Sequence, residues 1–148
     1  MTTRTRPGAV STVLILLILV AVYQLIGSLA ALTGAAAMET VDAVAESASV
    51  PTWAVLTAAG IGLVYGITAI VLAVMVHRNR PGARQAVTAV NTAYAVVILA
   101  LLATPVSGIP EIVMAGIALI VAGTANSTSA KEFFSTALPV GRAHPQAG

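Results

Sequence analysis

The sequence has no cysteine and little charge. Of its 148 residues, 8% are charged, 4% are aromatic and 58% are hydrophobic. An ordinary soluble domain carries about 25% charged residues, so this chain has too few to cover the surface of a water-soluble globule. The lack of cysteine excludes a disulfide framework, a thiolate zinc site, an iron–sulfur cluster and a cysteine nucleophile. The composition therefore predicts a membrane protein rather than a soluble enzyme domain.

Four long stretches contain no ionisable Asp, Glu, Lys, Arg or His in their interior. A helix needs about 20 apolar residues to cross the hydrocarbon core, and a charge at its middle costs at least about 2.5 kcal/mol. The stretches predict an all-α, polytopic membrane protein, an antiparallel bundle of four transmembrane helices with short interfacial helices. The fourth is short and needs either local thinning of the bilayer or residues from Ala125 onward. The predicted spans lie at about 9–33, 52–76, 85–104 and 109–124.

These spans divide the chain into three parts. Residues 1–8 form a cytoplasmic N-terminal segment, residues 9–125 form the four-helix transmembrane domain with an outer loop at 34–51, and residues 126–148 form a cytoplasmic tail. In the tail, Ser129 and Glu132 have the spacing of a capping box, which predicts a short amphipathic helix over about 130–138 at the membrane surface. A signal peptide ending near Ala35 is the alternative for the first span. We keep the span, because its apolar stretch is longer than a usual signal segment.

The basic residues all fall beside one side of the predicted bundle. They precede the first span, separate the second from the third, and follow the fourth. The positive-inside rule makes that side the cytoplasm, so both termini are expected to be cytoplasmic, in the cell membrane. The residues that decide this topology are Arg4, Arg6, Arg78, Arg80, Arg84, Lys131 and Arg142.

Three of the five acidic residues lie in the outer loop, and the interiors of the spans contain none. Glu39, Asp42 and Glu46 are spaced i, i+3, i+7, which places them on one face of a helix. We interpret this face as solvated, with a divalent-cation or basic-partner site as the alternative, because calcium needs more oxygen ligands in a tighter loop. The first span lacks the carboxylate on which small multidrug resistance transporters depend. No catalytic residue, metal ligand or cofactor site is predicted, and an enzyme is not expected.

A sparse set of polar side chains lies inside the predicted spans. Counting along the helices places Asn91 and Tyr65 at nearly the same depth, where they can hydrogen-bond across the bundle. Gln24 lies nearer the outer surface and is not expected to share one site with them. We interpret these contacts as fastenings between helices, worth about 0.6 kcal/mol each. The alternative is a small polar cavity lined by Tyr65, Asn91, Thr92 and Tyr94.

Small residues at helical spacing predict close contact between helices. Gly62 and Gly66 form a GxxxG step in the second span, and Ala58 extends it by one turn. Gly27 and Ala31 repeat the spacing at the end of the first span. We expect these residues to contact helices of the same chain, and contact with another chain is the alternative.

Two short phrases carry a resemblance to known proteins. An Arg-x-Arg-Pro-Gly-Ala phrase starts two outward-going helices, at 4–9 and 78–83, and a Thr-Ser-Ala-Lys-Glu-Phe-Phe phrase at 128–134 follows the last span. This layout resembles that of small actinobacterial four-span membrane proteins. The resemblance implies an actinobacterial source and a cell-membrane location, and it carries no catalytic residue. We interpret the repeated phrase as convergence, with duplication of a two-helix hairpin as the alternative.

The sequence thus predicts a non-enzymatic integral membrane protein that acts through helix packing. It would be an accessory or scaffold subunit of a membrane assembly, or a homo-oligomer. The expected partners are the lipid bilayer and another membrane protein or a second copy. A surplus of two positive charges is too small to indicate nucleic acid. The alternative function is a small uncoupled channel or carrier with a weakly polar lining.

Overall fold

Most of the described part of the chain is helical, and short turns join the helices. The computed structural model describes residues 7–39, 51–106 and 108–135. Every regular element within these ranges is a helix, which confirms the all-α prediction. The elements in chain order are α1 (Gly8–Glu39), α3 (Thr52–His77), α4 (Ala83–Ala100), the 3₁₀ helix η1 (Leu101–Ala103), α5 (Ile109–Ala125) and α6 (Thr128–Ser135).

Three helical segments are long and apolar enough to cross a membrane: α1, α3, and α4 together with η1. Helix α5 has 17 residues, and it reaches the length of a span only together with α6, across a bend of 60°. The described helices therefore supply three candidate spans, or four if the bent pair is one span. This supports the membrane-protein prediction, and the predicted number of four is reached only with α5 and α6 combined.

The prolines of the described ranges lie at helix ends or in turns, where a missing N–H costs least. The carbonyl of Pro7 accepts hydrogen bonds from the N–H groups of Val10 and Ser11 at the start of α1. Pro51 is the N-cap of α3, and Pro110 lies in the first turn of α5. The helix interiors therefore keep their backbone hydrogen bonds, as a segment surrounded by lipid requires.

Two helices have other bounds than the predicted segments. Helix α1 continues to Glu39, past the predicted end of the first span near residue 33. The added turn is rich in alanine, which has the highest helix propensity. Helix α6 begins at Thr128 rather than at 130, so Ser129 lies inside the helix instead of capping it. Asp42, Glu46 and most of the predicted tail lie outside the described residues.

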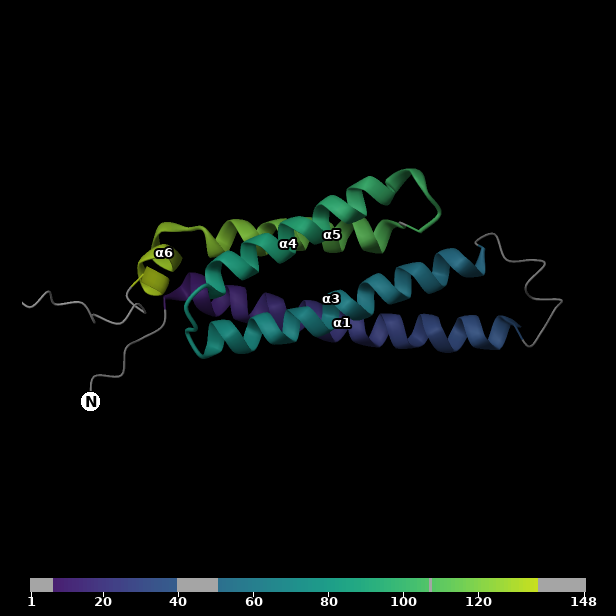
Figure 1. The fold of residues 1–148 in the computed structure, drawn as a ribbon, viewed down its shortest axis with the longest axis horizontal. Helices are drawn as coiled ribbons and strands as arrows, with labels where there is room; N and C mark the ends of the chain where they lie inside the picture. Colours follow the sequence, from purple (N-terminus) through teal and green to yellow (C-terminus); the bar gives the residue numbers. More distant parts are fainter. Residues whose placement is uncertain (1–6, 40–50, 107, 136–148) are drawn as a thin grey trace, which may run out of the picture.

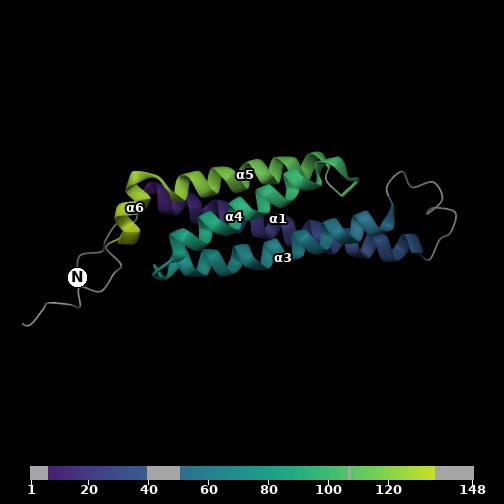
Figure 2. The same cartoon turned by 45° about the horizontal axis from the view of Figure 1, so that its top comes forward.

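The helices pack as two pairs. Helix α1 packs most extensively against α3, and α4 packs most extensively against α5. Figures 1 and 2 show that consecutive long helices run in opposite directions. In both views α3 and α4 meet near α6 and separate toward the other end. The pairs are joined by contacts between α1 and α5 and, less extensively, between α3 and α4.

Aliphatic side chains fill the space between the helices. Leu17 of α1, Leu72 of α3, Ile98 of α4 and Val121 of α5 are each at most 2% exposed. The outward faces are also apolar, and such a surface is suited to lipid rather than to water. Large exposed apolar side chains include Ile15, Leu19, Ile26, Val64, Val96 and Ile120.

Candidate functional site

Two tyrosines stack between α3 and α4. The rings of Tyr65 and Tyr94 are 3.7 Å apart between centroids and inclined by 4°. Both side chains are buried. Both tyrosines border a shallow surface groove of about 450 Å³ between α3 and α4. The stack therefore lies at a contact between the two helix pairs.

Asn91 anchors this stack to α4. The hydroxyl of Tyr65 donates a hydrogen bond of 2.7 Å to Oδ1 of Asn91. The Nδ2 group of Asn91 donates to the carbonyl of Val87, also at 2.7 Å. Because Asn91 is 0% exposed, these bonds replace the water that its amide would otherwise need. The structure thus contains the predicted hydrogen bond between Tyr65 and Asn91.

Gln24 joins the same cluster, contrary to the sequence-based expectation. Its Nε2 group donates a hydrogen bond of 2.7 Å to the hydroxyl of Tyr94. Tyr94 lies about 4.5 Å farther along α4 than Asn91, at 1.5 Å per residue, and both Gln24 and Tyr94 have long side chains. Their reach covers the difference in depth that counting along the backbone had implied. One cluster, which we call the polar cluster, therefore links α1, α3 and α4 through Gln24, Tyr65, Asn91 and Tyr94.

The GxxxG step holds α1 beside this cluster. A Cβ atom on Gly62 would fall 2.6 Å from Oγ of Ser28 and 2.9 Å from Oε1 of Gln24. On Gly66 it would fall 3.1 Å from Cγ of Leu25 and 3.2 Å from Cβ of Gln24. Both glycines therefore allow α1 and α3 of the same chain to approach closely. The close approach brings Gln24 within reach of Tyr94.

The remaining residues of the predicted packing faces and polar lining lie outside the polar cluster. Ala58 and Ala31 are half-buried. Gly27 is exposed, and a Cβ atom added there would meet nothing within 4 Å, so it makes no close helix contact among the described residues. Thr92 is also exposed, because it follows Asn91 directly and a helix turns by about 100° per residue. Thr92 is therefore not part of the polar cluster, whereas Gln24 is.

Sequence reasoning missed one close approach and one hydrogen bond between helices. Ser28 is 4% exposed and faces Gly62, and its i, i+4 spacing from Gln24 was the signal that both face α3. The Nδ2 group of Asn126, at the end of α5, donates to Oγ1 of Thr88 on α4 at 2.8 Å. This bond ties α5 to α4 near the start of α6. No local pattern pointed to the pairing, since the two residues are far apart in the sequence.

The basic residues of the described ranges cluster near α6. Arg78 and Arg80 lie between α3 and α4, Arg84 lies in the first turn of α4, and Lys131 lies in α6. Figure 1 shows the start of α1, the α3–α4 turn and α6 at the same end of the molecule. Arg4, Arg6 and Arg142 lie outside the described residues.

Acidic groups have local structural roles where they are described. The carboxylate of Glu111 accepts a hydrogen bond of 2.8 Å from the N–H of Gly108 at the start of α5. Within the described ranges, no three His, Asp or Glu side chains gather in a way that would hold a metal ion.

The chain matches no protein-family model, no curated protein and no solved structure. The functional argument therefore rests on the geometry of the helices and of the polar cluster.

Proposed function

We propose that this chain is a non-enzymatic integral membrane protein that acts through helix packing, as an accessory or scaffold subunit or as a homo-oligomer. We place it in an actinobacterial cell membrane as an antiparallel bundle of four spans, with both termini cytoplasmic. The orientation follows from the basic residues at the α6 end and the positive-inside rule.

The observation that carries the proposal is that the polar groups of the cluster form hydrogen bonds with one another. Its hydrogen bonds run between helices, from Gln24 to Tyr94 and from Tyr65 to Asn91. In the described part of the chain, the buried side-chain polar atoms without a partner are Asn79 Oδ1 and Ser127 Oγ, and both lie outside this cluster. Above and below it the interior is aliphatic. Polar groups used in this way fasten helices and leave the apolar outer faces for contacts with other membrane components.

The outward face of α5 provides variants for a test. Gly116 and Gly123 are spaced by two helical turns and are exposed, and a Cβ atom on either would meet nothing within 4 Å. Leucine at these positions is therefore tolerated by the fold but displaces a partner helix that packs there. Ala93→Leu is the matched control, because Ala93 is exposed on α4.

The experiment is purification of the tagged full-length chain in mild detergent, followed by mass spectrometry of what copurifies. We expect stoichiometric recovery of another membrane protein or of a second copy. Gly116→Leu with Gly123→Leu should reduce that recovery, and Ala93→Leu should not. A monodisperse, lone monomer from the unaltered chain would contradict the proposal.

The second candidate function is a small uncoupled channel or carrier. The observation that favours it is the gathering of Gln24, Tyr65, Asn91 and Tyr94 into one cluster, in which Tyr65 and Tyr94 border a surface groove between α3 and α4. It requires ion or solute flux in liposomes that Asn91→Leu abolishes. Flux with this dependence would replace the packing proposal.

A further inference from the structure

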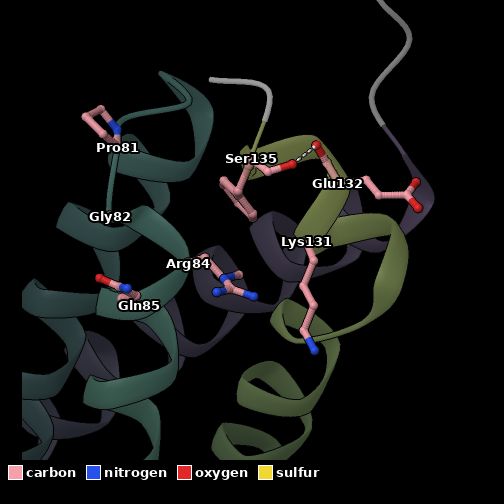
Figure 3. A pocket seen from close by; sticks show the side chains of 8 residues that line it. Pro81, Gly82, Arg84, Gln85, Lys131, Glu132 and Ser135 are labelled. Atoms are coloured by element: carbon pink, nitrogen blue, oxygen red, sulfur yellow. Dashed lines mark hydrogen bonds between the residues drawn. The ribbon is translucent and has the colours of Figure 1, made fainter. Parts of the chain in front are cut away.

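A second hollow lies at the basic end of the molecule, away from the polar cluster. It has a volume of about 550 Å³ and lies between the start of α4 and α6 (Figure 3). Helix α4 contributes Arg84 and Gln85, and α6 contributes Lys131 and Phe134. Helix α6 reaches this place because the chain bends by 60° after α5. We call this hollow the basic pocket.

Two cations share the basic pocket. In Figure 3, Arg84 extends from α4 toward the side of α6 that carries Lys131. Glu132 also borders the pocket, but its carboxylate is directed away from both cations. Both side chains carry a positive charge, and an anion bound in the pocket is attracted by each of them. The pocket therefore favours an anionic ligand.

The backbone of α4 adds donors at the same place. The N–H of Ala83 bonds to the carbonyl of Arg80, and the N–H of Ala86 bonds to the carbonyl of Gly82. The N–H groups of Arg84 and Gln85 lie between these two in the first turn. Among the described residues, no side chain caps this helix start. Uncapped N–H groups at a helix start carry partial positive charge and suit phosphate oxygens.

The pocket also lies at the polar boundary of a candidate membrane span. The apolar span of α4 and η1 starts at Ala83, so Arg84 and Gln85 flank its lipid-facing part. Phe134 is half-buried against the core and adds apolar surface to the pocket. Phospholipid phosphates lie at this level of a bilayer, next to the first apolar part of the lipid.

We propose that the basic pocket binds the phosphate group of an anionic phospholipid. Arg84, Lys131 and the first-turn N–H groups of α4 contact the phosphate, and Phe134 contacts the apolar part next to it. A soluble phosphate offers the same charge and the same oxygens but lacks the apolar part. The two sources are therefore distinguished by competition.

The test uses the full-length protein in uncharged detergent, titrated with phosphatidylglycerol, with the lipid-bound fraction measured by native mass spectrometry. Arg84→Gln combined with Lys131→Gln should weaken binding about 30-fold, since each basic residue near a headgroup contributes about 1 kcal/mol. The matched control is Arg78→Gln combined with Arg80→Gln, which removes the same charge at the same end but outside the pocket. In about 0.1 M salt the control should change the affinity less than about threefold, because exposed charges that do not line the pocket are screened from the bound phosphate.

Equal losses in the two double variants would mean general charge attraction and would overturn the proposal, as would no loss in either. Inorganic phosphate in large excess should leave the lipid bound. If phosphate displaces the lipid as well as a second lipid does, the soluble source is correct and the lipid assignment is overturned.

A measurement on the unaltered protein does not depend on how the variants fold. Phosphatidylglycerol with a photoreactive group next to its phosphate should crosslink to peptides that contain residues 81–85 or 131–135. Crosslinks confined to other segments would place the lipid elsewhere and overturn the proposal.

Discussion

The hydrogen bond between Tyr65 and Asn91 joins α3 to α4, and its contribution to stability can be measured. Tyr65→Phe removes the hydroxyl but keeps the ring that stacks on Tyr94 at 3.7 Å. Asn91→Leu removes the acceptor and keeps a side chain of similar size. Both residues are buried, at 4% and 0% exposure, so each single substitution leaves a buried polar group without its partner. We expect each to lower the free energy of unfolding by about 1–2 kcal/mol.

The double substitution removes both polar partners together. Its cost should therefore be smaller than the sum of the two single costs. Coupling energies between helices in membranes average about 0.6 kcal/mol and reach about 1.7 kcal/mol. The bond of 2.7 Å between two buried groups places this pair in the upper part of that range.

The assay is reversible unfolding of the full-length protein in mixed micelles, followed by the loss of helical circular dichroism. Thr92→Val is the control, because Thr92 is adjacent in the sequence but exposed. It should leave the unfolding free energy within about 0.5 kcal/mol of the unaltered value. Strictly additive single effects would refute the reasoning, since they would mean that Tyr65 and Asn91 do not interact in the membrane.

Three further predictions concern the other helix contacts and the topology. Gly66→Val should lower the unfolding free energy by about 1–3 kcal/mol, because the new side chain meets Leu25 and Gln24. Gly60→Val is the control and should have little effect, because no atom lies within 4 Å of a Cβ at that position. Equal effects of the two variants in the same unfolding assay would count against the α1–α3 contact. Asn126→Ala should cost about 1 kcal/mol through the lost bond to α4, and no measurable cost would show that this bond is unimportant. Single cysteines at Ser47 and Ser135 of this cysteine-free chain should differ in labelling by an impermeant maleimide in intact cells, with only the first labelled. Labelling of the cysteine at position 135 from outside the cell would show that the orientation is the opposite of the one proposed.

Much of the fold could be predicted because its cause is local. Long uncharged segments such as 9–33 must satisfy their backbone hydrogen bonds internally in lipid, and a helix does this within a single segment. The turn at Gly82 could likewise be anticipated from Pro-Gly, and Gly82 has a φ of 81° that favours glycine. Helix α1 continues beyond the predicted span because the residues after Gly34 are mostly alanine, which favours helix.

The candidate site could be predicted only in part. Tyr65 and Asn91 were paired correctly because both lie on directly connected, antiparallel helices, where depth can be counted from one shared turn. Gln24 was assigned to another level because counting along α1 places its backbone nearer the outer surface, and such counting does not include the reach of the side chains. Thr92 was included because it is a polar residue inside a predicted span, but adjacent helix positions point in different directions and Thr92 is exposed.

By itself, the sequence determined that this protein is built from apolar helices and that its described cations gather at one end, since segment length and charge are properties of the chain. Only the tertiary structure decided that Gln24 bonds to Tyr94, and that α6 folds back so that Lys131 shares a pocket with Arg84. The physical reason is that each of these pairings depends on the rotation of a helix about its axis and on the order of its neighbours. Side-chain contacts across the whole molecule set both of these, and no local segment encodes them.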